Sequence, residues 1–496
     1  MASKKHTEIK NKNNSEDIEN KNTTHHAQLL KITIKALILI LIVGIGLFYS
    51  DYKGYFNPDN SNNHTEKKWN WFYKFSKKSN VDILLLGNSH LYSGINPKNL
   101  SAALGANAFI LASPGTHIGD AYFGLKEALK ESTPSLVIIE TFGINNFDPY
   151  SLKEGNLSDQ FKSFSARKNI VEKIISTPSL FNVNNYPYAW SNTLRNHDFL
   201  YNNKKQLETN LKIIRGEKKT KKDKLYLGRF VRFTKGLQKD ILNEYDSKGA
   251  PVDGSKYEYS KYAEAYVDKI VSLCKEKDIK LLFLTLPMYS KHVSNYKIWK
   301  NKLSGIISNY NSPWLDLQLP EYTNDFPEFC FENTYDFNQH ITYQGSLIAT
   351  YKLAKFIKHT LNINLPNRSN DINWQRKFYG EEGYFENYPV LTNDKINKVI
   401  AKNKAIRNIT LKDVFLIKES KRTKLLVKIE RSLLKGKNLN GSTLILAIKM
   451  NENNSEKVVT VQLRYDAFHD VEKDAIFTQY LNSDNIIDIV DGEIRY

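Results

Sequence analysis

Two residues separate a serine from a short apolar run of the chain, in the stretch VDILLLGNSH. The run 81–86 is too short for a helix, and its content is typical of a strand buried on both faces of a parallel sheet. Ligands of such sheets bind at the carboxyl ends of the strands. Ser89 therefore stands where a nucleophile for acyl transfer would act. Gly-Asn-Ser is also ordinary turn chemistry, and Ser89 could simply cap the next helix.

Three further stretches hold residues that acyl transfer needs, namely a base and donors aimed at an oxyanion. Gly115 in ASPGTHIGD offers a backbone N–H with no Cβ in the way, and Asn145 in TFGINNF offers a side-chain amide. His340 in YDFNQHIT is the candidate base, with Asp336 four residues before it. Each residue alone also fits a plain turn or a structural histidine. Together they form one ordered set at expected strand ends.

The elements that must position these residues alternate between strands and helices. Such alternation predicts an α/β fold with a parallel sheet covered by helices on both faces. We expect strands at 81–86, 108–111, 134–141, 280–287 and 313–317, and helices at 96–104, 120–131, 259–279, 298–310 and 345–361.

The stretches that hold the serine, the glycine, the asparagine and the histidine occur along the chain in the order found in the SGNH (GDSL-like) hydrolases. The chain resembles this family over about 81–361, without the insertion described below. The GNSH stretch is similar to the family's Gly-Asp-Ser turn, and GINN to its Gly-x-Asn. The resemblance implies a flavodoxin-like three-layer domain with Ser89 as nucleophile and His340 as base. It also implies an oxyanion hole formed by the N–H groups of Ser89 and Gly115 and by the Asn145 amide.

The chain departs from the family pattern at two positions. Asn88 replaces the aspartate of the first block, which is not the base. Asp336 precedes His340 by four residues where the family has three. Either the loop bulges so that Asp336 still orients His340, or a backbone carbonyl does so, or the pair is inactive. His90 and His117 also fall near the expected site, where we expect them to support it without reacting.

The N-terminal region predicts the compartment. Residues 1–30 are polar and suggest disorder, whereas the apolar part of KITIKALILILIVGIGLFY reaches bilayer length when counted from Leu29 with Lys31 and Lys35 snorkelling. A cleaved signal peptide is the alternative, but no small-x-small cleavage site follows. The lysines before the segment predict a cytoplasmic N-terminus and an extracytoplasmic remainder.

Two regions interrupt the α/β pattern. The first is a long insertion with the basic run RGEKKTKKDK, which we expect to contain helices of its own. The second is a strand-rich C-terminal region, interpreted as a small β-rich, sandwich-like domain. The predicted organisation is a disordered cytoplasmic tail (1–30), a signal anchor (31–50), a linker and first helix (51–80), the SGNH-like domain (81–366, insertion 148–255) and the accessory domain (367–496).

Composition limits the remaining possibilities. The chain has 496 residues and a formal net charge of +18, which suits anionic glycans, headgroups or nucleic acid. No zinc-finger, RNP1-like or P-loop motif accompanies the charge, so nucleic acid is not expected as a partner. The two cysteines exclude a disulfide-rich scaffold and leave one disulfide or two free thiols open. The histidines lack ligand spacing, so neither a metal nor another cofactor is expected.

The anchored layout is similar to the alginate and peptidoglycan O-acetylation proteins and to the lipoteichoic acid D-alanylation protein. This resemblance implies an esterase or O-acyltransferase for a cell-envelope or exported glycan, with acetyl as the expected group. It further implies a membrane-bound O-acyltransferase as partner. The alternative from another class is a catalytically silent glycan-binding or scaffold subunit.

Overall fold

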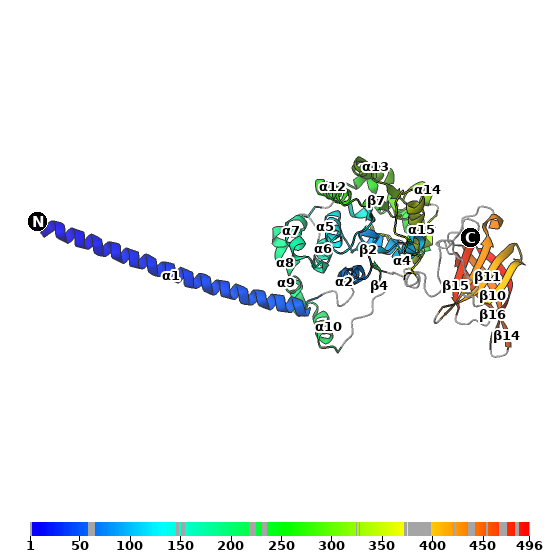
Figure 1. Ribbon diagram of the computed structural model, residues 1–496, viewed down its shortest axis with the longest axis horizontal. Coiled ribbons are helices and arrows are strands. Elements are labelled where there is room, and N and C mark those ends of the chain that lie inside the picture. The colour runs from blue at the N-terminus through cyan, green and yellow to red at the C-terminus, as the bar shows by residue number, and fades with distance from the viewer. Residues whose placement is uncertain are drawn as a thin grey trace. The chain divides into compact units, whose positions relative to one another are not determined.

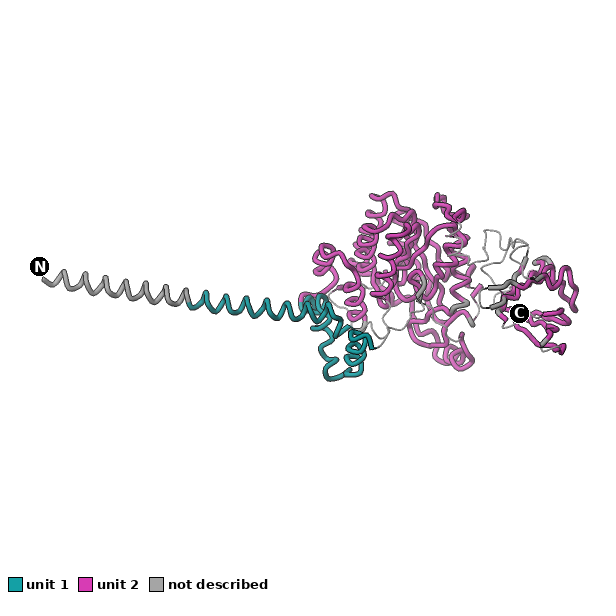
Figure 2. Tube along the Cα trace, turned by 60° about the horizontal axis from the view of Figure 1, so that its bottom comes forward, with its two compact units in different colours: residues 1–63, 184–221 teal, residues 64–183, 222–496 magenta. Residues whose placement is uncertain are grey.

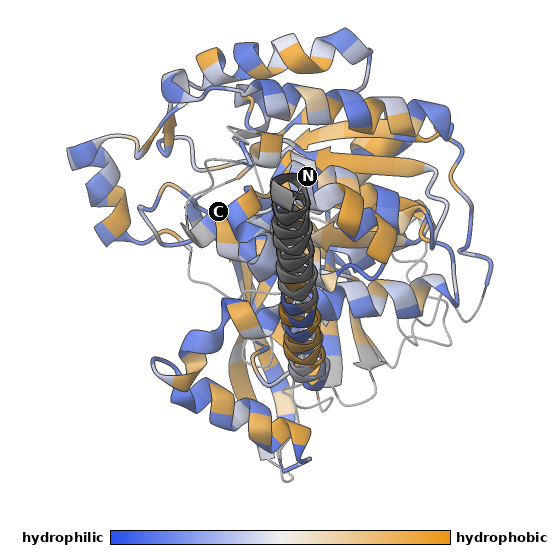
Figure 3. Ribbon diagram, turned by 90° about the vertical axis from the view of Figure 1, so that its left-hand side faces the viewer, coloured by the Kyte–Doolittle hydropathy of each residue, from blue (hydrophilic) through white to orange (hydrophobic). Residues whose placement is uncertain are grey.

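The N-terminal helix is the longest element of the computed structural model. Helix α1 spans Ala2–Lys53, and its part Gln28–Lys53 is long and apolar enough to cross a membrane (Figure 3). This fits either a single-pass anchor or a signal sequence. The helix begins before the apolar part, and the disorder expected of 1–30 stays a prediction. The structure describes residues 2–57, 65–144, 148–149, 154–217, 225–230, 236–323, 325–326, 328–371, 374, 398–419, 422–434, 442–452, 455–465, 474–481 and 486–495.

The chain divides into two compact units (Figure 2). Residues 1–63 and 184–221 form the first unit, and residues 64–183 and 222–496 form the second. Within the first unit, the backbone N–H of Thr193 donates to Asp51 Oδ1 at the end of α1 (2.7 Å), and its hydroxyl bonds to the same oxygen. The short helices after residue 184 are thereby fastened to the end of the apolar helix.

A parallel five-stranded sheet forms the centre of the second unit (Figure 1), with strand order β2-β1-β3-β7-β9. Its strands are β1 (Ile83–Gly87), β2 (Ala108–Ala112), β3 (Leu136–Glu140), β7 (Lys280–Thr285) and β9 (Trp314–Asp316). Every residue of β1, β2 and β3 is buried, as expected of a sheet covered on both faces. All five predicted strands are confirmed, with shifts of a few residues at their ends.

Helices cover both faces of this sheet. Ile83 and Leu85 of β1 share a core with α4 (Pro97–Leu104) and α15 (Tyr343–His359), whereas Leu86 faces α5 (Ile118–Ala128) on the other side. The remaining helices of the α/β part are α2 (Thr65–Ser76), α3 (Ser89–Gly94), α12 (Lys261–Glu276), α13 (Tyr296–Ile307) and α14 (Pro320–Thr323). The predicted α/β fold with a parallel sheet is therefore confirmed.

The insertion contains helices, as expected from its length. They are α6 (Glu154–Ala166), α7 (Ile170–Leu180), α8 (Tyr186–Trp190), α9 (Asn192–Arg195), α10 (Lys204–Ile214) and α11 (Lys239–Lys248). The basic run lies largely outside the described residues. Both cysteines are free and buried, which decides between the two alternatives left by the sequence.

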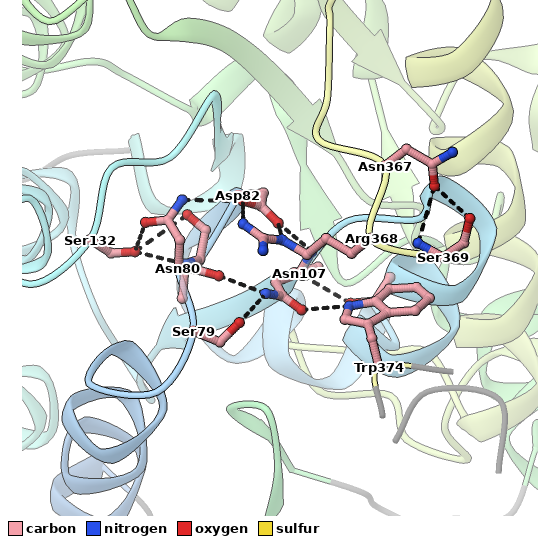
Figure 4. Close-up of polar contacts among 12 residues, drawn as sticks. Ser79, Asn80, Asp82, Asn107, Ser132, Asn367, Arg368, Ser369 and Trp374 are labelled. Atoms are coloured by element: carbon pink, nitrogen blue, oxygen red, sulfur yellow. Dashed lines mark hydrogen bonds and ion pairs between the residues drawn. The ribbon is translucent and has the colours of Figure 1, made fainter. Parts of the chain in front are cut away.

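A polar network fastens the segment after α15 to the amino-terminal edge of the sheet (Figure 4). The guanidinium of Arg368 donates to both oxygens of Asp82, at 2.5 and 2.7 Å, just before β1. The indole N–H of Trp374 donates to Asn107 Oδ1, just before β2 (2.8 Å). Asp82 also accepts the backbone N–H of Asn107 (2.8 Å), so the two fastenings belong to one network.

The C-terminal region is a seven-stranded antiparallel sheet, with order β10-β11-β12-β15-β14-β13-β16. Its edge strands β10 and β16 contact one another, so the sheet closes into a near-barrel with one core. The expected sandwich is therefore corrected: within the described residues the strands form one curved sheet rather than two stacked ones. The strands are Lys398–Ile406, Ile409–Glu419, Arg422–Glu430, Thr443–Glu452, Ser455–Tyr465, Asp474–Leu481 and Ile486–Arg495.

Candidate active site

Ser89 is the first residue of the short helix α3, immediately beyond β1. Asn88 caps this helix, because its side-chain oxygen accepts the backbone N–H of His90 (2.9 Å). Ser89 itself is 8% exposed at the carboxyl edge of the sheet. The sequence expectation that a serine stands at this strand end is confirmed, and Asn88 rather than Ser89 provides the cap.

The glycine that precedes this turn is required by the neighbouring strand. A Cβ built on Gly87 would lie 2.7 Å from the Cβ of Glu140, the last residue of β3. Real Cβ atoms do not approach so closely, so only glycine fits between the two strand ends. The close approach places the turn of Ser89 directly against Glu140.

Three strand-end turns converge at this edge. A Cβ built on Gly143 would lie 3.1 Å from the carbonyl oxygen of Thr116 and 3.8 Å from Asn88 Nδ2. Gly115 has φ +58°, a left-handed conformation that glycine adopts without strain. A Cβ there would come within 3.0 Å of Asp159 Oδ2 on α6, so the insertion covers the turn of Gly115. The sequence did not indicate Asp159.

The candidate base His340 is paired with a carboxylate that the sequence did not indicate. Its Nδ1 lies 3.2 Å from Glu332 Oε2, and both side chains are buried. The pairing arises because residues 330–332 and 340–342 run antiparallel: Glu332 N–H donates to the His340 carbonyl (2.9 Å), and Thr342 N–H to that of Cys330 (2.8 Å). A carboxylate on Nδ1 fixes the ring and leaves Nε2 as the atom that accepts a proton.

Asp336, the sequence candidate for this role, is exposed. Its backbone N–H bonds to the hydroxyl of Thr334 (3.2 Å), at the tip of the same hairpin. The spacing argument was misleading because antiparallel pairing brings residues eight apart together, whereas a loop argument considers only near neighbours. The hairpin could have been found from the apolar residues Phe331 and Ile341, which face each other across the bridge beside the pair. Asn145, the third expected oxyanion donor, lies outside the described residues.

His90 connects the turn of Ser89 to His340. Its ring lies 5.1 Å from the His340 ring, centroid to centroid, and stacks on Phe142 at 4.1 Å. Its Nε2 lies 2.8 Å from Asn338 Oδ1. Burial, and then the charge of His340, lowers the pKa of His90 to about 3, so the ring is neutral at physiological pH. His117 is the N-cap residue of α5, and burial lowers its pKa to about 4. That both histidines support the site without reacting stays a prediction.

A buried lysine of α2 contacts both the end of β2 and helix α3, which begins with Ser89. Lys68 of α2 is 2% exposed; its Nζ donates to the carbonyl of Ala112 (2.6 Å) and lies 3.8 Å from the ring centroid of Tyr92 on α3. Burial lowers the pKa of Lys68 well below its usual value. The lysine therefore joins the end of β2 to α3, and only its place in the amphipathic pattern of 65–76 could have indicated it.

Glu140 is a buried acid at the centre of the site. One oxygen accepts the backbone N–H of Phe142 (2.8 Å), while the other, Oε2, is buried without a partner among the described residues. Burial raises the pKa of Glu140 to about 8, against the opposing effect of N–H donors from Phe142 and Gly143. The neutral acid thus shapes the turn 141–144 that leads to Asn145.

Comparisons with known proteins give little beyond this geometry. No family model matches the chain, and no curated protein matches it. Among solved structures, a chain described as a gut microbial diltiazem-metabolizing enzyme is similar at 9% identity, with a TM-score of 0.28, over 77% of this chain and 70% of that one. A similarity of this size carries no argument about function.

Proposed function

We propose that the protein is a membrane-anchored SGNH-type serine esterase or O-acyltransferase that acts on an acylated glycan outside the cytoplasm. The observation that carries the proposal is the buried His340–Glu332 pair beside the helix that begins with Ser89. The strand order also supports it: in chain order, the five strands follow the 2-1-3-4-5 arrangement of flavodoxin-like sheets, whose ligands bind at the carboxyl edge.

In the proposed reaction, Ser89 Oγ attacks the acyl carbonyl while Nε2 of His340 takes the hydroxyl proton. Glu332 holds the imidazole and stabilises the imidazolium that forms. The N–H groups of Ser89 and Gly115, with the Asn145 amide, would hold the oxyanion. Collapse of the tetrahedral intermediate releases the sugar alcohol, which receives the proton from His340, and leaves acyl-Ser89. Water or another sugar hydroxyl then takes the acyl group by the same steps in reverse.

The geometry weakens the main argument for a catalytically silent scaffold. That alternative depended on an imperfect fourth block, in which His340 had no orienting carboxylate at the expected position. Glu332 supplies a carboxylate at Nδ1 from the facing strand of the hairpin. The glycan substrate, the acetyl group, the extracytoplasmic side and a membrane-bound O-acyltransferase partner remain parts of the proposal that rest on the resemblance.

The test uses the full-length protein in detergent micelles, incubated with an activated acetyl ester and followed by intact-protein mass and ester turnover. We expect an acetyl-sized mass gain that is lost in Ser89→Ala. Glu332→Gln should lower turnover by up to about 10⁴-fold, as loss of the orienting carboxylate does in serine triads. The matched variant Asp336→Asn should leave turnover unchanged. A folded protein without acylation, or equal losses in the two carboxylate variants, would contradict the proposed site.

A further inference from the structure

Helix α7 exposes its apolar face. Ile170, Val171, Ile174 and Ile175 are each at least half exposed, at 57, 56, 59 and 50%. Their spacing of one, three and four residues puts them on one side of the helix. A helix at the surface of a globular domain normally turns such a face to the core, so this stripe indicates an interaction surface.

The opposite face of α7 is polar and buried. Glu172 forms ion pairs with Lys126 (2.8 Å) and Lys130 (3.2 Å) beside α5. Ser176 and Thr177 lie on the same buried face and bond back to the carbonyl of Lys173. Leu180 in the last turn is also buried, but the four branched aliphatic side chains of the first two turns face away from the protein while Glu172 packs against it.

Both ends of α7 are fixed, which sets the rotation of the helix about its axis. Asn169 caps the first turn by accepting the N–H of Glu172 (3.0 Å), and its own N–H donates to Glu127 (3.0 Å). Beyond the last turn, Phe181 is fully buried and stacks on Phe161 at 5.1 Å. The exposed stripe is therefore a property of the folded unit.

The covalent chain sets an upper limit on the distance between α7 and the end of α1. Thr193, which bonds to Asp51 at the end of the apolar part of α1, follows Leu180 by 13 residues (193 − 180). Thirteen residues span at most about 45 Å even when fully extended. Lys168, which precedes the cap residue Asn169, is an exposed residue whose Nζ lies 4.4 Å from the ring centroid of Tyr73. The chain carries a net charge of +18, which suits anionic headgroups.

We propose that the stripe Ile170, Val171, Ile174 and Ile175 rests on the surface of the bilayer that α1 crosses. The contact would be that of an interfacial helix, whose apolar face sits among the headgroups and the first acyl carbons. It gives the second unit a lipid contact in addition to its covalent tether. This inference rests on the membrane anchor of the proposed function, but it is independent of the proposed reaction, because none of the four residues belongs to the site of Ser89.

The test places a fluorescent label on α7 in the full-length protein. The two native cysteines are buried, so a single added cysteine can be labelled selectively. Ile174→Cys carries the label, and Ile298→Cys on α13, an isoleucine that is 45% exposed beside the exposed Lys297, is the matched control. The proteins are reconstituted into phosphatidylcholine–phosphatidylglycerol vesicles that contain a lipid with a nitroxide at the headgroup.

We expect the label at position 174 to lose about half of its fluorescence to the nitroxide, because an interfacial face lies roughly 5–10 Å into the headgroup region. The label at position 298 should lose little. Quenching at position 174 no stronger than at position 298 would overturn the proposal. A label at position 174 that is shielded from aqueous iodide without nitroxide quenching would also overturn it, since a protein would then cover the stripe. Labels at 170 and 175 repeat the measurement should Ile174→Cys disturb folding.

Discussion

Replacing Glu140 by glutamine is expected to make the stability of the α/β part less dependent on pH. The acid is buried with a pKa raised from 4.5 to about 8, so the folded protein keeps its proton where the unfolded chain has lost it. Stability is therefore fully present below pH 4.5 and falls as the pH rises towards 8. Glutamine keeps an acceptor for the Phe142 N–H and has no proton to lose.

The magnitude follows from the shift. One proton of difference between the folded and unfolded states changes the free energy of unfolding by about 1.4 kcal/mol per pH unit. From pH 4.5 to pH 7 the wild type thus loses about 3 kcal/mol that Glu140→Gln keeps, and at pH 8 the difference approaches about 5 kcal/mol. We expect the two proteins to have similar stability near pH 4.5 and to diverge steadily above it.

The assay is urea unfolding of the full-length proteins in detergent at pH 5, 6, 7 and 8, followed by tryptophan fluorescence. All six tryptophans precede residue 375, so the signal does not report on the C-terminal sheet. The difference between variant and wild type cancels the titration of groups that both share. A difference that stays constant from pH 5 to pH 8 would refute the assignment of Glu140 as a buried neutral acid.

Three further changes test other parts of the structure. Gly87→Ala should destabilise the protein by about 1–3 kcal/mol, as overpacking does, because its Cβ would meet Glu140; urea unfolding measures the loss. Arg368→Ala should cost about 1–3 kcal/mol in the same assay, because the fully buried Asp82 loses a charged donor. Lys68→Met should remove a rise in stability that the wild type shows as the pH increases towards 10.5, since a lowered folded-state pKa favours folding at higher pH.

Surface variants serve as controls for these three. Gly305→Ala, where nothing lies near the new methyl group, should not lose stability as Gly87→Ala does. Lys248→Ala breaks an exposed ion pair with Glu244 and should change stability by less than about 1 kcal/mol. Equal effects of Arg368→Ala and Lys248→Ala would contradict a structural role for the network at the amino edge. A parallel pH dependence of Lys68→Met and wild type would contradict the buried amine.

Much of the α/β part could be predicted because its signals are local. Residues 83–86 are apolar at every position, and the helix Lys261–Glu276 carries a clear amphipathic pattern, so strands and helices were found within three residues of their ends. The curvature of the C-terminal sheet could not be predicted. Closing a sheet depends on which edge strands meet, and alternation along one strand is the same in a sandwich and in a barrel.

Part of the candidate site could also be predicted from local signals, and the rest depended on contacts between distant segments. Ser89 and Gly115 follow strands, so their position at the carboxyl edge came from strand order alone. The partner of His340 required a pairing between two short segments, and spacing along the chain pointed to Asp336 instead of Glu332. Glu140 looked like the polar end of a strand, because burial of a carboxyl group depends on neighbours that only the folded sheet brings together.

The fastening of Arg368 and Trp374 decides where the chain can be divided. A protein that ends after residue 359 would contain every described strand and helix of the α/β part, but Asp82 would lose its contact with Arg368 and Asn107 its contact with Trp374. A protein that ends after residue 374 would retain both. The boundary of an independently folding piece is thus set by side-chain hydrogen bonds at the amino edge of the sheet, fifteen residues beyond the end of the last helix of the α/β part (374 − 359).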